Sequence, residues 1–480
     1  MIVSVDKTNR SRLDVPTYTY IAPLNKITIN FSGNNGQQVA ATTFINTEEK
    51  RDIHPQVQSF IQQANLLGLT HAGMADQPTD ISEFSDSKNN RVRFRSNELI
   101  IGFPRIERKA IASVILDYKL RLRWFDSRGW FGLYRVTEIP IERVFEQLAR
   151  DKRVLYAEPN ILDGADIFDV SDLEDDGVSP PQDVLWNHSV LNRKSGWSVS
   201  DGRGVIVAVV DAPIWLNHPG LSNALYTKNN DFHFGESPPE PQAHGTSVAS
   251  ILCDSTLVGG YTLGLCPAAK LLPVSIDTSA NSSYAGRARA INFLAQVATN
   301  REAITKSGER LPVPRLVVNC SWQLQGAQDL TSVARAFTSL SQAGGICVCS
   351  AGNSDTDAPH YPSDYPSCIS IAGLTKTLSK SKYSNYGKAI SFSMPGGDGT
   401  PYDLNDIFAA QSVNRFDYCS GTSFASPHAA GMFAVHWSRN PNLTPSQLIE
   451  IIKTRFSLPL ETTNPALVGQ LGAGLICFAT

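Results

Sequence analysis

The sequence predicts an α/β protein with a doubly wound parallel sheet, preceded by a small α+β module. Two observations support this prediction. From about residue 183 onward, short apolar runs alternate with helical segments, which is typical of a parallel sheet with helices on both faces. Upstream, residues from about 98 to 160 follow the order β-α-β-β-α-β.

The C-terminal part supplies the parallel sheet. Apolar runs without alternation indicate strands buried on both faces. The carboxyl ends of such strands are where a doubly wound sheet places functional side chains. The expected strands are Val205–Val210, Leu271–Ile276, Leu316–Trp322, Ile346–Ser350 and Cys368–Leu374, and the clearest helices are Tyr284–Thr299 and Thr331–Ala343.

The upstream module has its own periodicity. Its second helix carries Ile141, Val144, Phe145 and Leu148 at i, i+3, i+4 and i+7, which gives one apolar face. The other expected elements are a strand at Glu98–Phe103, a helix at Arg108–Lys119, a hairpin ending in Gly132–Val136, and a closing strand at Val154–Asn160.

We divide the chain into an N-terminal extension of unknown role (1–90), the module (91–160), a linker (161–182) and the main domain (183–480). The linker holds seven acidic residues and no Lys or Arg, and like charges keep such a segment extended. Within the extension, Lys26–Phe31 resembles a strand, and the polar stretch Asp76–Asn90 is expected to be loose.

Composition excludes several classes of function. The net charge of −3 and the absence of a basic tract argue against nucleic-acid binding. No apolar run approaches the roughly 18–20 residues of a membrane helix. Residues 1–10 lack the apolar core of a signal peptide, and all eight cysteines fall after residue 250, several in buried strands. We therefore expect a cytoplasmic protein with reduced thiols.

Cys347 and Cys349 share one face of their strand by period two. A metal or redox pair is the alternative to a pair of buried thiols, but the spacing fits no zinc pattern. We expect no metal and no cofactor.

Three motifs carry residues suited to hydrolysis. Asp211 ends the apolar run that starts at Val205, His244 opens a helix, and Ser423 follows a Gly-Thr turn at a helix start. A serine becomes nucleophilic when a neutral imidazole takes its proton, and a buried carboxylate fixes the imidazole tautomer. Each motif alone has a more ordinary interpretation, as a strand end, a helix cap or a turn.

Together, in the order Asp, His, Ser, the motifs resemble the subtilisin-like serine proteases. Neighbouring segments strengthen the resemblance, namely His218–Leu221, Gly264–Val274 and Tyr383–Gly387. The resemblance implies a subtilisin-like fold and a serine endopeptidase that cleaves polypeptide substrates through an acyl-enzyme. In that family the asparagine of a Ser-Ala-Gly-Asn turn binds the oxyanion, and Asn353 matches it.

The resemblance also implies a substrate-binding set. Asn319-Cys320-Ser321-Trp322-Gln323 stands where the family has Asn-x-Ser-x-Gly along the cleft. Gln323 in place of glycine puts a side chain near the specificity pocket, so the family's preference does not transfer. The expected contacts are Ser321, Trp322, Gln323, Tyr284 and Gly352.

The module, with its Tyr156–Asn160 ending, resembles the inhibitor-like propeptide of these proteases, which is ferredoxin-like. The resemblance implies a self-inhibited precursor whose own N-terminal module blocks the site. A permanent domain of the same topology is the alternative.

Three other functions compete with an endopeptidase of broad use. A specialised intracellular maturation protease would suit the unusual aspartate turn, Asp211-Ala212-Pro213-Ile214-Trp215. Trp215 replaces a carboxylate that serves a calcium site in several family members, so that site is not expected.

A silent peptide-binding module would commonly lose a catalytic residue, and this sequence keeps all of them. A lipase-type esterase would need Gly-x-Ser-x-Gly, which is not found here.

Overall fold

The computed structural model describes residues 28–32, 38–42, 44–45, 81–85, 91–104, 108–136, 141–148, 150–162, 184–193, 200–278, 282–324, 330–400 and 404–478. The chain forms two compact units. The first unit comprises residues 1–166, 279–289 and 324–336, and the second comprises 167–278, 290–323 and 337–480. The predicted acidic linker lies almost wholly outside the described residues, as does most of the N-terminal extension.

The second unit is built on a six-stranded sheet in the order β12-β9-β15-β16-β17-β18. All five pairings are parallel, so the predicted doubly wound sheet is confirmed. The order reverses direction at β9, which makes the carboxyl end of β9 a topological switch point. The strands are β9 (Ile206–Asp211), β12 (Lys270–Ser275), β15 (Leu316–Cys320), β16 (Ile346–Ser350), β17 (Ile369–Leu374) and β18 (Ile390–Pro395).

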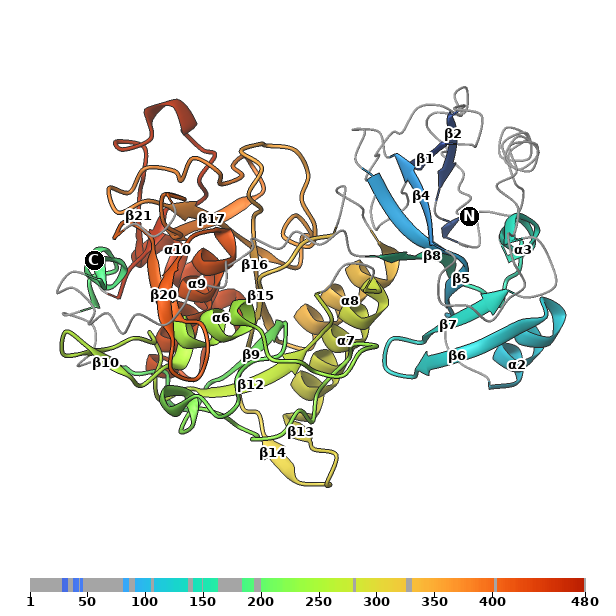
Figure 1. Ribbon diagram of the computed structural model, residues 1–480, viewed down its shortest axis with the longest axis horizontal. Helices are drawn as coiled ribbons and strands as arrows, with labels where there is room; N and C mark the ends of the chain where they lie inside the picture. Colours follow the sequence, from blue (N-terminus) through green and yellow to red (C-terminus); the bar gives the residue numbers. More distant parts are fainter. Residues whose placement is uncertain are drawn as a thin grey trace. The chain divides into compact units, whose positions relative to one another are not determined.

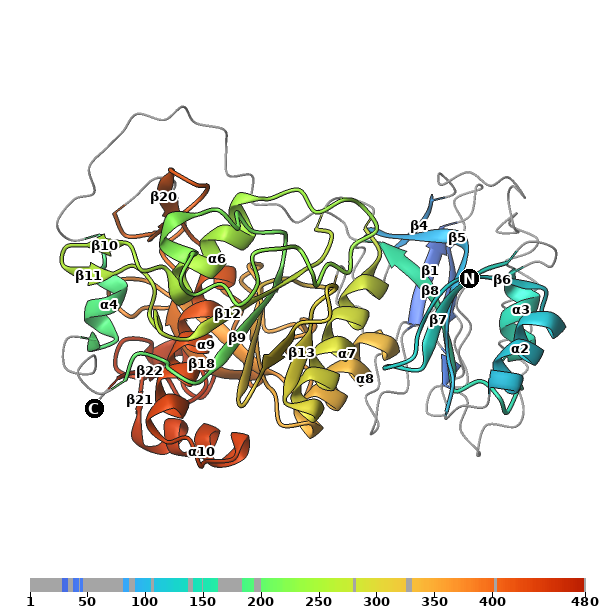
Figure 2. The ribbon, with the colours of Figure 1, turned by 90° about the horizontal axis from the view of Figure 1, so that it is seen from below.

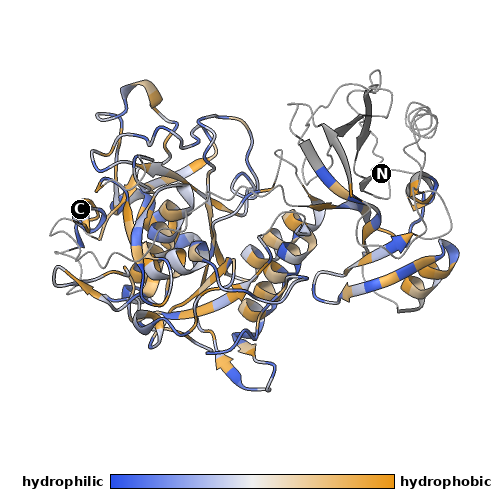
Figure 3. Cartoon of the chain, in the orientation of Figure 1, coloured by the Kyte–Doolittle hydropathy of each residue, from blue (hydrophilic) through white to orange (hydrophobic). Residues whose placement is uncertain are grey.

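Helices cover both faces of this sheet (Figures 1 and 2). On one face lie α6 (Ala243–Cys253) and α9 (Thr422–Arg439), and on the other lie α7 (Tyr284–Asn300) and α8 (Thr331–Gln342). The middle strands are buried throughout because Val, Ile and Ala point to both faces. In Figure 3 α7 and α8 carry both apolar and hydrophilic residues, as expected of helices with one face on a sheet.

Helix α9 is the core helix of the second unit. Ala425, Ala429, Met432 and Phe433 are fully buried in the main hydrophobic core. Small residues allow α9 to run close beneath the sheet, and this burial fixes the position of its N-terminus, where Ser423 lies.

Shorter elements complete the second unit. Among them, the hairpin formed by β19 (Ile407–Ala410) and β20 (Phe416–Cys419) packs against α6. They are α4 (Trp186–Val190), η1 (Pro219–Leu221), β10 (Leu257–Val258), β11 (Tyr261–Thr262), β13 (Glu302–Ile304), β14 (Arg310–Pro312), β19 (Ile407–Ala410), β20 (Phe416–Cys419), α10 (Pro445–Arg455), β21 (Ser457–Leu458), η3 (Pro465–Leu467) and β22 (Leu475–Ile476).

The first unit contains the predicted β-α-β-β-α-β order. Its four strands pair antiparallel in the order β8-β5-β7-β6, with the first and third strands central, which is the ferredoxin-like arrangement. The elements are β5 (Arg91–Gly102), α2 (Arg108–Asp117), β6 (Leu120–Asp126), β7 (Phe131–Val136), α3 (Ile141–Leu148) and β8 (Tyr156–Leu162).

Two features of the first unit differ from the sequence prediction. The strands β1 (Thr28–Ser32), β2 (Gln38–Thr42), β3 (Phe44–Ile45) and β4 (Ile81–Ser85) extend the same sheet, so residue 90 is not a boundary of that sheet. Strand β4 lies in the stretch Asp76–Asn90, which the sequence predicts to be loose. It forms because β5, which begins at Arg91, pairs with it.

The first turns of α7 and α8 also belong to the first unit. There the carboxylate of Glu158 accepts hydrogen bonds from the backbone N–H groups of Thr331 and Ser332, and burial raises its pKa to about 7. No helix among the described residues is long and apolar enough to span a bilayer.

Candidate active site

Asp211 is the last residue of β9, at the switch point of the sheet. Its side chain is 1% exposed, and its Oδ1 accepts a hydrogen bond from the backbone N–H of Ala212 at 2.7 Å. The chain turns sharply after the buried strand, so this carboxylate stays under the sheet edge instead of reaching solvent.

His244 is the second residue of α6 and binds Asp211. Its Nδ1 donates a hydrogen bond of 2.8 Å to Oδ1 of Asp211, while a third of the histidine side chain remains exposed. Desolvation opposes protonation of His244, but the charge of Asp211 and this hydrogen bond outweigh it, so the pKa of His244 is raised above 6.5. The bond leaves Nε2 as the nitrogen directed away from the carboxylate.

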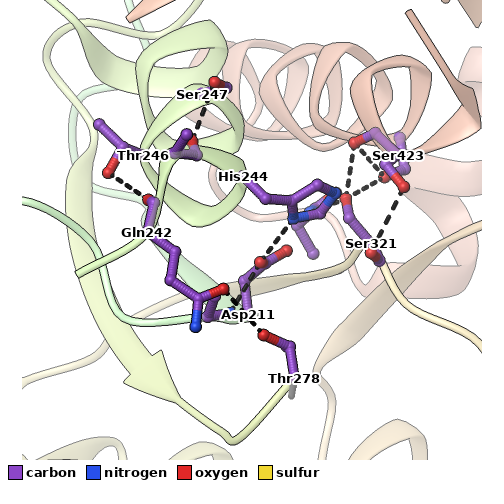
Figure 4. Close-up of polar contacts among 12 residues, drawn as sticks. Asp211, Gln242, His244, Thr246, Ser247, Thr278, Ser321 and Ser423 are labelled. Carbon is purple, nitrogen blue, oxygen red and sulfur yellow. Dashed lines mark hydrogen bonds and ion pairs between the residues drawn. The ribbon is translucent and has the colours of Figure 1, made fainter. Parts of the chain in front are cut away.

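Ser423 is the second residue of α9. The preceding Gly421 has φ +145°, a conformation that favours glycine, and this turn brings Ser423 to the helix start. The Oγ of Ser423 donates to the carbonyl of Ser321 at 3.4 Å, and the Oγ of Ser321 donates to the carbonyl of Ser423 at 2.7 Å. Figure 4 shows His244 between Asp211 and this serine pair.

The structure therefore brings together the three residues that the sequence predicted for hydrolysis. Among the described residues Ser423 makes its side-chain bond to Ser321 and none to His244. Catalytic hydrogen bonds in unliganded enzymes are often long or misaligned and tighten when substrate binds. The arrangement suits transfer of a proton from Ser423 to Nε2 of His244.

Asn353 is oriented by Thr422, the residue before Ser423. Its Oδ1 accepts hydrogen bonds from the backbone N–H and from the hydroxyl of Thr422, both at 2.9 Å. The same hydroxyl accepts from the N–H of Gly352 at 3.0 Å. Because these bonds occupy the amide oxygen, the amide nitrogen of Asn353 is left as a donor beside the N-terminus of α9.

The segment after β15 lies beside this site. Ser321 contacts Ser423 directly, and Trp322 is buried on Phe337, with ring centroids 6.0 Å apart. Gln323 reaches His360, whose Nε2 donates to its Oε1 at 2.9 Å. Tyr284 belongs to the first unit and is buried with Arg287 over its ring, and its contact with substrate stays a prediction.

Sequence reasoning missed two residues. Thr422 stands inside the Gly-Thr-Ser motif, and its role in holding Asn353 needed only the proximity of the two turns. No spacing pointed to His360. The only hint was the shortness of the stretch from Asn353 to Tyr365, which leaves little chain to carry His360 away from Gly352.

Candidate metal ligands do not gather anywhere in the part of the chain that the structure describes. There, no three His, Cys, Asp or Glu side chains form a group that could hold a metal ion.

Residues 202–474 match the family model described as the subtilase family. The chain belongs to the subtilase family. It is 27% identical to thermitase of Thermoactinomyces vulgaris over 244 residues. The aligned part covers 50% of this chain and 78% of thermitase. It is 28% identical over 306 residues to a thermophilic serine proteinase of Bacillus sp. strain AK1, covering 63% and 68% of the two chains.

Solved subtilases share the fold. Fervidolysin of Fervidobacterium pennivorans aligns with TM-score 0.60 and 18% identity, covering 84% of this chain and 61% of fervidolysin. The epidermin leader peptide processing protease of Staphylococcus aureus aligns with TM-score 0.60 and 15% identity, covering 80% and 96%. This subtilase is thus a subtilisin-like serine protease that acts on polypeptides.

Proposed function

We propose that this subtilase hydrolyses peptide bonds with Asp211, His244 and Ser423 as its catalytic triad. The observation that carries the proposal is the 2.8 Å bond from Nδ1 of His244 to the buried Asp211, which selects the tautomer with a free Nε2 facing the serine. Nε2 takes the proton of Ser423 as Oγ attacks the scissile carbonyl, and returns it to the leaving amine. A water then attacks the acyl-enzyme and transfers its proton to Nε2. As the bond from the acyl carbon to Oγ breaks, Nε2 returns this proton to Oγ, which releases the acid and regenerates Ser423.

Asn353 supplies a donor for the oxyanion in this scheme. Its amide nitrogen would act together with the backbone N–H of Ser423, which lies in the first turn of α9; the bond that holds the Asn353 amide oxygen on Thr422 supports this role. Donors fixed before the reaction stabilise the developing charge without a cost of reorganisation in the transition state.

A fluorophosphonate probe tests the proposal directly, because it reacts with an activated serine whatever the peptide preference. We expect labelling of the wild type and none of Ser423→Ala. Ser438→Ala, which removes a hydroxyl from the far end of the same helix, is the matched control and should be labelled like the wild type. A folded wild type that resists the probe would instead support the silent peptide-binding module.

We further propose that the enzyme is made as a self-inhibited precursor. The ferredoxin-like topology of the first unit supports this, since the family's inhibitor-like propeptides share it. Self-cleavage is expected between about residues 160 and 185, outside most of the described residues. N-terminal sequencing decides between the two alternatives. A wild type that starts in that range, with an intact Ser423→Ala chain, would support a cleaved propeptide. An active enzyme that still begins at Met1 would support a permanent domain.

A specialised maturation protease is the second candidate. The structural neighbour from Staphylococcus aureus is named as a leader peptide processing protease, and another neighbour, with TM-score 0.50, is named as a lanthipeptide protease. A cytoplasmic location fits this candidate. All eight cysteines lie within the described ranges and none forms a disulfide there.

A further inference from the structure

The carboxyl ends of β15 and β16 hold the two chain segments that flank the reacting bond. The strands are adjacent and parallel, with Cys320 paired to Cys349, so residues 321–323 and 351–353 leave the sheet side by side. Ser321 contacts Ser423, and Gly352 immediately precedes Asn353. A carbonyl held by Ser423 and Asn353 would bring the side chain on its acyl side next to these segments.

His360 and Gln323 join the two segments across that space. The Nε2 of His360 donates to Oε1 of Gln323 at 2.9 Å. The ring also lies directly over Gly352, because a Cβ built on Gly352 would be 2.5 Å from Cδ2 and 2.6 Å from Nε2 of His360. The imidazole thus occupies the volume that adjoins Gly352.

Neighbouring residues hold the ring in place. Nδ1 of His360 bonds to the hydroxyl of Ser363 at 2.9 Å, and the backbone N–H of His360 donates to Asp364 at 3.1 Å. A chain of ring contacts joins the first segment to the loop that carries His360: Trp322 contacts Phe337, Phe337 contacts Tyr365, and Tyr365 contacts Tyr361. A side chain only 8% exposed and bonded at both nitrogens does not move aside without loss of both bonds.

We propose that the His360–Gln323 pair restricts this subtilase to peptide bonds that follow a small side chain, namely Gly, Ala or Ser. This inference rests on the proposed function, because it assumes that Ser423 is the nucleophile. The pair presents no net charge at neutral pH, since burial keeps the imidazole unprotonated, so the selection is by size and not by charge. Both residues are specificity-determining and take no part in proton transfer.

Peptidyl diphenyl phosphonates test the proposal without knowledge of the natural substrate. They react with the active serine, which bonds to phosphorus and releases phenol, and their side chain next to phosphorus occupies the space in question. We would compare inactivation rates for an Ala-like and a Phe-like reagent. Excluding a bulky side chain is typically worth about 10–100-fold, so we expect the Ala-like reagent to react at least about 10-fold faster with the wild type.

Three variants isolate the pair. Gln323→Gly, His360→Ala and the double variant should lower the Ala-to-Phe rate ratio by about 10-fold or more, chiefly through faster reaction of the Phe-like reagent. Asp357→Ala, an exposed change in the same loop, is the matched control and should keep the wild-type ratio. Gln323 is partly exposed, so Gln323→Gly provides the test even if His360→Ala does not fold.

The outcomes distinguish a failure of this proposal from a failure of the proposed function. Equal or faster wild-type reaction with the Phe-like reagent overturns the proposal, as does an unchanged ratio in folded Gln323→Gly. If the fluorophosphonate, which carries no such side chain, also fails to label the wild type, the fault lies with the proposed function.

Discussion

Two histidines of the second unit, His244 and His360, are hydrogen-bonded through Nδ1 and lie near the same reacting centre. Their surroundings nevertheless shift their pKa values in opposite directions. The partner of His244 is the charged Asp211, and together the charge and the bond outweigh desolvation and raise the pKa of His244. The partner of His360 is the neutral Ser363, so burial prevails and lowers the pKa of His360 to about 4. The difference comes from one carboxylate: with Asp211 beside it, His244 can exchange protons, whereas His360 stays neutral and keeps a fixed position.

The largest expected effect comes from removing that difference at His244. Asp211→Asn keeps the shape but removes the charge, so kcat should fall by about 10⁴-fold. The acid limb of kcat/KM against pH should also move to lower pH, because burial still lowers the pKa and nothing raises it. Measurements between pH 5 and 9 check both expectations.

Ser423→Ala and His244→Ala should each lower kcat by about as much as the double variant does, because the triad acts as a unit. Substitution of His360 is the matched comparison, and the acid limb of His360→Gln should stay at its wild-type position. An acid limb that follows His360 in place of His244 would exchange the roles of the two rings.

A smaller effect is expected at Asn353. Asn353→Ala should lower kcat by about 10²–10³-fold with KM little changed, because the amide nitrogen acts on charge that develops only in the transition state. Steady-state kinetics on a single peptide give both constants. A loss carried mainly by KM would place Asn353 in ground-state binding, beside His360, and not in the chemistry.

The same contrast shows what could be inferred from sequence. Asp211, His244 and Ser423 could be placed because each stands at the end of a strongly patterned element: a buried strand, and the first turns of two helices. The alternation of elements likewise sufficed for the parallel sheet and for the β-α-β-β-α-β module. His360 could not be placed, because it lies in an irregular loop whose path depends on packing against Trp322 and Phe337.

Other misses have the same physical origin. Strand β4 has little intrinsic signal and forms because β5 offers it a partner. The strand expected to reach Trp322 ends at Cys320, and the side chain of the next residue, Ser321, bonds to α9. In both cases a contact with another element overrides the local preference.

Unfolding stability should also distinguish the two histidines. The pKa of His360 in the folded state is about 4, below its unfolded value of roughly 6.5, so its contribution is present above pH 6.5 and is lost as pH falls toward 4. His244, with a raised pKa, contributes below pH 6.5 and loses that contribution as pH rises. From pH 7 to 5, His360 alone should account for about 2 kcal/mol of lost stability.

Urea unfolding of the wild type and of His360→Gln at both pH values measures this difference. The variant should lose about 2 kcal/mol less than the wild type on acidification. His428 and His436, whose pKa values burial also lowers to about 4, are present in both proteins and cancel in the comparison. Equal losses in the two proteins would mean that His360 is protonated as readily in the folded as in the unfolded chain.

The smallest expected effect concerns calcium beside Asp211. Trp215 stands where the family pattern described above would have a carboxylate, and its backbone N–H donates to the hydroxyl of Thr246 at 3.1 Å. The turn after Asp211 is thus tied to α6 by a protein contact, and we expect the Asp211–His244 pair to keep its geometry without an ion. A ligand that does not bind the native state cannot stabilise it, so EDTA should shift the Tm by less than about 1 °C. Thermal unfolding with EDTA and after calcium is added back provides the measurement. A fall of several degrees that calcium reverses would show that an ion supports the fold, and kcat/KM under the same conditions would show whether it supports the pair.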